Sequence, residues 1–519
     1  MPGKSCKGGD PVSFLGLDIG TSGCKASIID VSGNCLAQAY REYPLISLQP
    51  GWQEIDPERV WQSVRQVIAK ALAGCPADPI RAVSVSSFGE AVIAIDRDGN
   101  PLCNSMIYID CRGRQEADDL EYRLGSGKVL GITGTTILPL YSICKIMWLK
   151  KNLPELYRKT WKFLLFADFI LFKLGAGAFT DYSLATRTMA FDIIKKQWST
   201  EILDCAGIDK EKFGEPVQSG TVIGQVSRAA AADLGLPANA LLVAGGHDQP
   251  CAALGAGVIR SGLAVDGLGT TECITPAFDH PILSDAMAQN YFACVPHVVP
   301  DMYVTYAFTF TSGSVLKWYR DNWGRYYQDE AARLGVNVYD LMIDRAINIP
   351  AAAEAAPVFV LPHFAGAATP YMDTAAQGAI IGLNINTRPE AIIRGILEGM
   401  TFEIMVNVER LALAGVTVDE LVAVGGLARS DAFLQLKADM MGKKVTTLHV
   451  SEAGTLGVAI LAGTACGVYK DLDDAVEKLV RKKIVFYPDD RLHDQYLEKF
   501  ETYKRMYPAV NSILHSPVK

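Results

Sequence analysis

The most informative feature of this 519-residue sequence is what it lacks. No segment has the run of about 18 uncharged apolar residues that a membrane-spanning helix needs. Lys and Arg total 49 against 57 Asp and Glu, a net charge of −8, which argues against a nucleic-acid binder, because such proteins present basic patches. The amino terminus has no apolar signal core, and we therefore expect a cytoplasmic protein.

Several common catalytic and binding motifs are also missing. The 12 cysteines are scattered without a CxxC, and the seven histidines form no HxxxH, which excludes the common zinc patterns and a thioredoxin motif. We expect free thiols. There is no GxxxxGK[ST] loop, no GxSxG elbow and no GxGxxG after a strand. Phosphate groups would therefore have to bind at hairpin turns.

The order of predicted elements favours an α/β fold. Apolar periodicity predicts a helix over residues 57–73, and residues 163–172 (FLLFADFILF) are expected to form a buried helix. Expected strands occupy residues 14–17, 24–30, 34–42, 82–85 and 92–96 in the first part of the chain. The length alone is compatible with two to four domains of about 150 residues.

One segment occurs twice. LGLDIGTSGCKA near the amino terminus and LAVDGLGTTECI near residue 263 share an apolar strand, an Asp, a Gly-Thr turn and a second strand. A Gly-rich stretch at 255–262 separates the two halves, so we predict two domains, 12–258 and 259–510. Two such halves facing one another would bring both Gly-Thr turns to a shared cleft.

The two turns suit phosphate binding. Such a turn offers backbone N–H groups and hydroxyls to phosphate oxygens, while an aspartate such as Asp18 can hold a hydrated magnesium ion. From one copy alone an Asx-type hairpin turn is the better interpretation, but the second copy reverses that preference. The predicted phosphate-binding residues are Gly20, Thr21 and Ser22 in the first turn and Gly269, Thr270 and Thr271 in the second.

Asp248 is the candidate catalytic base. A strand at 241–244 leads into Gly-Gly-His-Asp-Gln-Pro and a helix of small residues. Asp248 would also suit a helix N-cap, and Pro250 the first helical turn, for structural reasons alone. A carboxylate at this place could nevertheless accept the proton of a substrate hydroxyl during phosphoryl transfer. Gln249 could bind a polyol, and His247 is expected to lie behind the site or at its rim and not to act as a catalyst.

Further candidates follow other predicted strands. Gly425 and Gly426, with Ser430 shortly after, end a strand at 421–424, where paired glycines admit a flat ligand, although a tight strand-to-helix turn explains them equally well. Glu90, Tyr108 and Asp110 could bind a hydroxyl-rich ligand. A surface ion pair between Asp110 and Arg112 is as good an interpretation.

These motifs, in this order, resemble the FGGY carbohydrate kinases from about residue 14 to 507. Residues 142–149 and 378–398 follow the two signatures of that family, with Leu140 and Ala391 as departures. The resemblance implies two ribonuclease-H-like domains of the actin-like ATPase superfamily with a central cleft. It also implies ATP and Mg²⁺, with Asp18 near the metal, Asp248 as base, and Gly425 and Gly426 against the adenosine.

The resemblance leaves the substrate open. Ala367 and Ala368 replace a charged pair, and Gly89 precedes Glu90 where glycerol kinases carry an arginine. The pattern is similar to that of a pentulose kinase with a divergent sugar pocket, so we expect a ketopentose such as xylulose. Alternatives are glycerol or another polyol, ribulose, fuculose, or a module that binds nucleotide and sugar without catalysis. We expect no partner beyond sugar and ATP, except that a homodimer is allowed.

Overall fold

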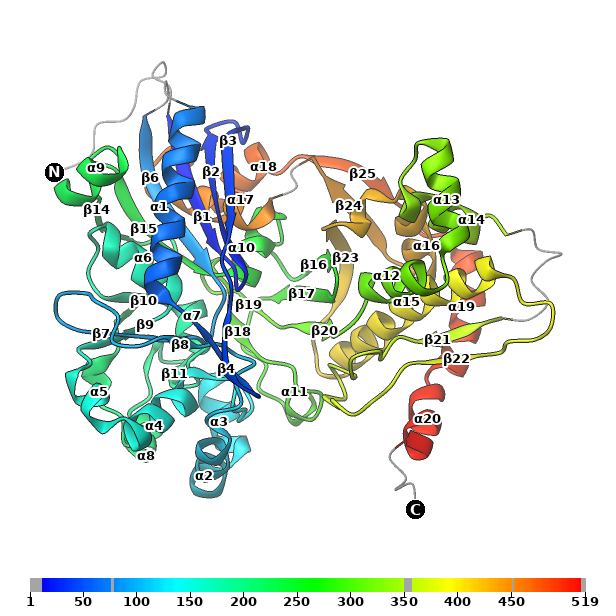
Figure 1. Ribbon diagram of the computed structural model, residues 1–519, viewed down its shortest axis with the longest axis horizontal. Coiled ribbons are helices and arrows are strands. Elements are labelled where there is room, and N and C mark those ends of the chain that lie inside the picture. Colours follow the sequence, from blue (N-terminus) through cyan, green and yellow to red (C-terminus); the bar gives the residue numbers. More distant parts are fainter. Residues whose placement is uncertain (1–11, 76–78, 350–356, 450–451, 515–519) are drawn as a thin grey trace.

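The computed structural model describes residues 12–75, 79–349, 357–449 and 452–514, which form two lobes, each around one large sheet (Figure 1). The first sheet runs in the order β14-β15-β6-β1-β2-β3. Its strands are β1 (Ser13–Ile19), β2 (Gly23–Asp30), β3 (Cys35–Glu42), β6 (Ile80–Ser87), β14 (Val222–Gln225) and β15 (Leu241–His247).

The second sheet runs in the order β18-β19-β17-β16-β23-β24-β25, with β20 also paired to β17. Its strands are β16 (Gly262–Leu268), β17 (Glu272–Phe278), β18 (Val295–Pro296), β19 (Tyr303–Val304), β20 (Ala307–Thr309), β23 (Val418–Val424), β24 (Lys444–Leu448) and β25 (Lys482–Phe486).

The two sheets repeat one arrangement. β1 is antiparallel to β2 and parallel to β6, and β16 is likewise antiparallel to β17 and parallel to β23. The duplicated Gly-Thr turns join β1 to β2 and β16 to β17. The duplication read from the sequence is therefore confirmed.

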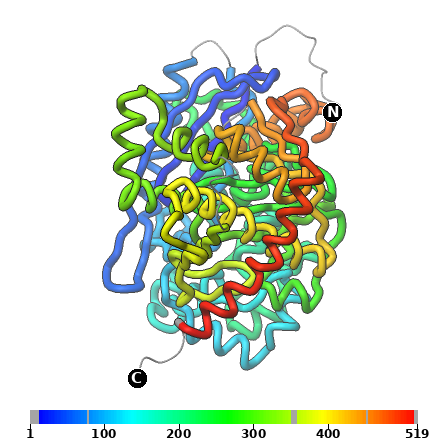
Figure 2. The backbone as a smooth tube through the Cα atoms, turned by 90° about the vertical axis from the view of Figure 1, so that its right-hand side faces the viewer, coloured from blue at the N-terminus to red at the C-terminus, as the bar shows by residue number. Residues whose placement is uncertain are grey.

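Helices cover both sheets. In the first half they are α1 (Pro57–Gly74), α2 (Arg114–Leu124), α3 (Ser126–Thr133), α4 (Ser142–Asn152), α5 (Pro154–Lys159), α6 (Phe166–Leu174), α7 (Tyr182–Thr186), α8 (Thr200–Ala206), η1 (Lys210–Lys212), α9 (Arg228–Leu234) and α10 (Asp248–Gly255). In the second half they are α11 (Asp285–Gln289), α12 (Gly313–Asn322), α13 (Arg325–Leu334), α14 (Val338–Ile347), α15 (Pro389–Leu413), η3 (Leu427–Arg429), α16 (Asp431–Met441), α17 (Ala453–Ala465), α18 (Leu472–Leu479), α19 (Asp490–Tyr503) and α20 (Met506–Leu514). Figure 2 shows α19 and α20, in red, crossing the outer face of the second lobe.

Short sheets of two or three strands complete the fold. They are β4 (Ile46–Gln49), β5 (Trp52–Ile55) and β8 (Ser105–Met106); β7 (Ile93–Ile95) with β9 (Lys162–Leu164); β10 (Phe179–Asp181) with β13 (Glu215–Val217); β11 (Phe191–Asp192) with β12 (Gln197–Trp198); and β21 (Phe359–Leu361) with β22 (Ala379–Ile381).

The lobes meet where α10 crosses α17 (Figure 1). Gly255 on α10 and Gly457 on α17 lie at the crossing, where a Cβ on either would overlap the backbone of the other helix. α17 also packs on β1, β6 and β15, so a late segment of the chain covers the first sheet. Apolar side chains of the two halves share one buried cluster here, including Phe14, Leu254 and Leu456. The boundary at residue 258 stays a prediction.

The expected helix at 163–172 is wrong at its beginning. Phe163 lies in β9 and pairs with Ala94 of β7, and the helix begins only at Phe166. Asp168 explains the break, because its buried carboxylate accepts hydrogen bonds from the backbone N–H of Leu165 and from the Thr180 hydroxyl, which fixes the helix start.

Two further sequence expectations concern the cysteines and the membrane-spanning helices. The cysteines among the described residues are free, as expected. Within the same residues, no helix is both long and apolar enough to cross a bilayer.

Candidate active site

The candidate catalytic carboxylates lie at neighbouring strand ends. β1, β6 and β15 are parallel neighbours, with Asp18 opposite Ser86 and Ser86 opposite Gly246. Because parallel strands end at one edge of a sheet, Asp18 and the residues after β15 come together there. Ser86 Oγ donates to Asp18 Oδ1 at 2.7 Å. The sheet therefore places the predicted metal ligand beside the predicted base.

Asp248 is the first residue of α10 and directly follows β15. Burial raises the pKa of its carboxyl from 3.8 to about 7, and the nearby Asp18 and Glu90 carboxylates act in the same direction. A group with this pKa accepts a proton readily at neutral pH. Its environment is that of a general base.

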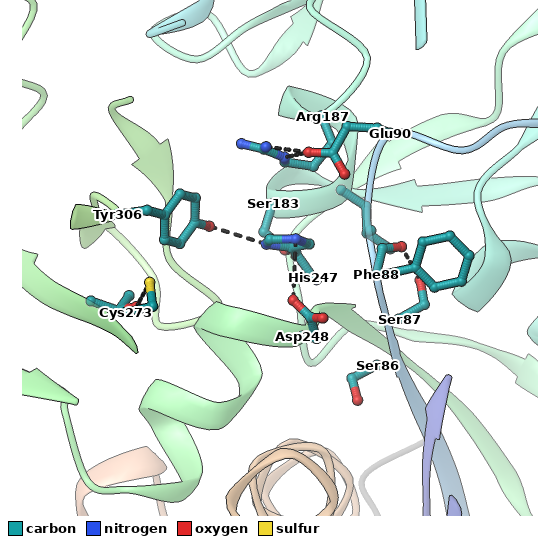
Figure 3. A network of polar contacts seen from close by, with 12 residues as sticks. Ser86, Ser87, Phe88, Glu90, Ser183, Arg187, His247, Asp248, Cys273 and Tyr306 are labelled. Atoms are coloured by element: carbon teal, nitrogen blue, oxygen red, sulfur yellow. Dashed lines mark hydrogen bonds and ion pairs between the residues drawn. The ribbon is translucent and has the colours of Figure 1, made fainter. Parts of the chain in front are cut away.

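His247 contacts Asp248 from behind the site (Figure 3). Its Nε2 lies 3.2 Å from Asp248 Oδ1, and its Nδ1 lies 3.1 Å from the Tyr306 hydroxyl. Burial, together with the adjacent Arg187 cation, holds the His247 pKa well below its usual range, so the ring is neutral. The His247 backbone N–H donates to Ser183 Oγ at 2.8 Å, which anchors the end of β15.

Glu90 is held by an arginine that the sequence analysis missed. Arg187 Nε donates to Glu90 Oε1 at 2.6 Å, and Nη2 bonds the same oxygen. A Cβ on Gly89 would lie 2.6 Å from Arg187 Cγ, so the absence of a side chain there makes room for Arg187. Glu90 itself has a φ of 64°, a strained left-handed conformation of the kind found at functional sites.

The other predicted sugar-binding residues differ in their surroundings. Burial and the carboxylates of Glu90 and Asp248 raise the pKa of Tyr108, which places that side chain at the site. Gln249 follows Asp248 in α10 and is half-buried. Asp110 instead lies within its own lobe, where it accepts from the Gln53 backbone N–H at 2.7 Å and pairs with Arg112, whose cation lies over the Trp52 ring. That ion pair is buried, not on the surface.

The first predicted phosphate turn follows β1. The Gly20 N–H donates to the Gly23 carbonyl at 2.9 Å, and the Tyr43 hydroxyl donates to the Gly20 carbonyl at 2.6 Å, which fixes the turn. The Thr21 and Ser22 side chains are partly to fully exposed. Their hydroxyls can therefore reach a ligand.

The residues around Asp18 fit a magnesium ion. A Cβ on Gly454 would lie 3.3 Å from Asp18 Oδ2, so only a glycine leaves that oxygen uncrowded. No group of three or more His, Cys, Asp or Glu able to hold a metal occurs among the described residues. Mg²⁺ commonly uses one or two carboxylates together with phosphate and water ligands. Asp18 could supply one such carboxylate.

The second predicted phosphate turn borders a cavity of about 510 Å³, which is large enough for a nucleoside. Four predicted nucleotide-binding residues line it: Gly269, Thr270, Gly426 and Ser430. Gly425 and Thr271 are adjacent in sequence but do not line it. Ser430 also caps α16 by accepting from the Phe433 N–H.

The sequence analysis missed one side of this cavity. The beginnings of α12 and α14 supply Gly313, Ser314, Lys317, Asn337 and Tyr339. The Ser314 N–H and hydroxyl both donate to the Thr270 carbonyl, which ties α12 to the second turn. The run Thr-Ser-Gly-Ser at 311–314, small and polar just before a helix, could have indicated this side.

Comparison with known proteins decides the family. Residues 13–255 match the sequence model of the N-terminal domain of the FGGY family of carbohydrate kinases, and residues 267–466 match that of its C-terminal domain. The chain belongs to the FGGY carbohydrate kinases. It is therefore an ATP-dependent phosphotransferase that acts on a carbohydrate hydroxyl.

Relatives of this FGGY kinase match along nearly the whole chain. Xylulose kinase of Bacillus subtilis is 28% identical over 495 residues, covering 95% of this chain and 96% of the relative. Autoinducer-2 kinase of Klebsiella pneumoniae is 30% identical over 508 residues, covering 95% and 93%. The crystal structure of gluconate kinase from Lactobacillus acidophilus matches with a TM-score of 0.86 at 24% identity, covering 98% and 99%.

One departure from the family pattern and one residue that follows it have clear positions in this FGGY kinase. Ala367 and Ala368, which replace a charged pair, are both buried. Ser142 of the first signature begins α4, and its hydroxyl donates to the carbonyl groups of Glu90 and Arg187. The first signature thus fixes the backbone on which the Glu90–Arg187 pair rests.

Proposed function

We propose that the protein transfers the γ-phosphoryl group of ATP to a primary hydroxyl of a ketopentose such as xylulose, with Asp248 as general base. The hydroxyl proton moves to Asp248, the hydroxyl oxygen bonds the γ-phosphorus, and the bond to the β-γ bridging oxygen breaks to release ADP. The observation that carries the proposal is the position of Asp248, whose pKa is raised to about 7 beside Asp18 at a shared strand edge.

Nucleotide binding is assigned to the second lobe. The adenosine would occupy the 510 Å³ cavity, bordered by Gly426, with Gly425 adjacent. From there the phosphates would extend along the turn at Gly269, Thr270 and Thr271 toward the first turn at Gly20, Thr21 and Ser22. Backbone N–H groups suit this task in a chain of net charge −8, because the overall field of the protein does not attract ATP.

Asp18 would hold Mg²⁺ with the help of phosphate oxygens. When bound, the ion neutralises charge on the transferring phosphoryl group. The protein's own contribution is the carboxylate pair, since Asp18 raises the pKa of Asp248 when no cation lies nearby.

Sugar binding is assigned to Glu90, Tyr108 and Gln249. Arg187 bonds only Oε1 of Glu90, so Oε2 can accept a hydrogen bond from a sugar hydroxyl. Asp110 is not included, because its contacts bind it to Arg112 and Gln53. The ketopentose assignment is supported by the full-length relatives named xylulose kinase.

The test is an assay of ADP release with Mg·ATP and a panel of acceptors. The panel contains xylulose, ribulose, fuculose, glycerol, gluconate and autoinducer-2. We expect xylulose or ribulose to give the highest kcat/KM and a product phosphorylated on a primary hydroxyl, identified by ³¹P-coupled NMR. A preference for autoinducer-2 or gluconate over every ketopentose would contradict the substrate class, and no stimulation by any acceptor would contradict sugar phosphorylation.

A further inference from the structure

A tyrosine from the second sheet reaches the residue before the catalytic base. Tyr306 lies between β19 and β20, whereas His247 ends β15 of the first sheet. The Tyr306 hydroxyl is 3.1 Å from His247 Nδ1, and both side chains are less than one-tenth exposed. Figure 3 shows the His247 ring between the other two side chains, with Tyr306 to one side of the ring and Asp248 below it. The contact joins the two halves of the chain directly behind Asp248.

The surroundings select one tautomer of His247. Arg187 lies close to the ring and disfavours an imidazolium, so the ring carries one N–H. If that hydrogen were on Nδ1, the lone pair of Nε2 would face the Asp248 carboxylate at 3.2 Å, which is repulsive. The Tyr306 hydroxyl can donate to Nδ1, and the hydrogen then belongs on Nε2, the ring nitrogen that lies 3.2 Å from Asp248 Oδ1.

We propose that Tyr306 and His247 act as a positioning pair for the catalytic base. Tyr306 fixes the tautomer, and His247 holds Asp248 Oδ1 so that Oδ2 faces the substrate hydroxyl. The inference rests on the proposed role of Asp248 as base. Both side chains are buried, so we expect their effect to be transmitted through the Asp248 carboxylate.

The first test separates kcat from KM in three variants. Tyr306→Phe removes only the hydroxyl and is expected to lower kcat about tenfold. His247→Leu removes both ring nitrogens and is expected to lower kcat by about 10- to 100-fold, the range for a lost hydrogen bond to a charged group. His247→Gln keeps a side-chain N–H near the Nε2 position and is expected to recover at least a third of wild-type kcat. KM for sugar and ATP should change less than threefold in all three variants.

Tyr303→Phe is the matched control, because Tyr303 is a buried tyrosine three residues away that packs against Phe278 and not against His247. Its kcat should equal that of the wild type. A Tyr306→Phe variant with wild-type kcat, or a His247→Gln variant as slow as His247→Leu, would overturn the inference.

A double-mutant cycle tests whether Tyr306 acts through His247. In the His247→Leu background, Tyr306→Phe should lower kcat less than twofold, because the residue that it orients is gone. A further tenfold loss would overturn the pairing. These outcomes are distinct from failure of the proposed function, since they are read only in an enzyme whose wild type phosphorylates a sugar.

Discussion

The two copies of the repeated segment place an aspartate at the same point and use it differently. Asp18 in β1 and Asp266 in β16 both precede a Gly-Thr turn and both lie between an antiparallel and a parallel neighbour. Asp18 is partly exposed, and Ser86 donates to one of its oxygens. Asp266 is fully buried, with Lys437 Nζ 2.6 Å from its Oδ2.

Lys437 distinguishes the surroundings of Asp266 from those of Asp18. It comes from α16, is fully buried, and pairs with both Asp266 and Glu272 beneath the second turn. Ser312, just before α12, donates to the other oxygen of Glu272 at 2.8 Å, so the network supports one wall of the 510 Å³ cavity, where Gly313 and Ser314 follow. The backbone of the turn is thus the same in both copies, whereas the neighbouring side chains leave Asp18 partly exposed and pair Asp266 with a buried cation.

The largest expected effect comes from exchanging the two aspartates for asparagine. Asp18→Asn should lower kcat at least about 10³-fold, because a charged group beside the transferring phosphoryl is lost, while the thermal midpoint does not fall. Asp266→Asn should lower the thermal midpoint and leave kcat of the folded enzyme within about threefold. Steady-state kinetics and calorimetry on both variants measure kcat and the thermal midpoint. If the two substitutions changed both quantities equally, the two aspartates would not differ in role.

Lys437→Met should destabilise the second lobe by about 3–5 kcal/mol, because two buried carboxylates lose their shared cation. Urea unfolding monitored by tryptophan fluorescence measures the change. Lys478→Met is the control, since Lys478 forms an i,i+4 pair with Asp474 on the surface, where ion pairs contribute little to stability. A Lys437 variant as stable as this control would show that the network does not matter.

Gly426→Val separates nucleotide binding from chemistry. A Cβ at Gly426 meets no atom within 4 Å, so the fold accepts it, but the larger side chain enters the cavity. We expect KM for ATP to rise about tenfold, as for a loss of roughly 1.4 kcal/mol of binding, with KM for sugar and the thermal midpoint unchanged. An unchanged KM for ATP would place the adenosine elsewhere.

The pH dependence is expected to report Asp248. Since the base must be ionised, kcat/KM should fall about tenfold per pH unit below the carboxyl pKa of about 7 and level off above it. The free energy of unfolding should change with pH in the opposite direction to the rate. The folded-state pKa exceeds the unfolded value of 3.8, so ionisation of Asp248 opposes folding as pH rises between 3.8 and about 7. A rate profile flat between pH 5 and 8 would contradict the assignment.

The sequence predicted the features that are local. Strands ending in Gly-Thr turns, the strand before Asp248 and the glycines at 425–426 all depend on short patterns, and the structure has them where they were expected. The contacts that it missed join residues across long stretches of chain: Glu90 to Arg187, Glu272 to Lys437, and His247 to Tyr306. No periodicity marks such pairs, because only the folded sheets bring them together.

Gly89 is another position whose role depends on a residue far away in the sequence. In the sequence it is only a departure from the family pattern. In the structure, its missing side chain is the space that Arg187 fills, so the guanidinium comes from the residue after α7 instead of from position 89. The helix expected at 163–172 begins only at Phe166 for a similar reason, since the residues before it pair with β7.

The most direct test of the account is phosphoryl transfer in Asp248→Asn, measured in a single turnover with enzyme in excess over ATP and with saturating xylulose. Asp279→Asn, an exposed aspartate on the second lobe, serves as control. The account predicts that Asp248→Asn binds ATP like the wild type and is at least as stable as the wild type at pH 8. Its rate of phosphoryl transfer should be lower than that of the wild type by at least about 10³-fold. Transfer within about tenfold of the control would contradict Asp248 as the base.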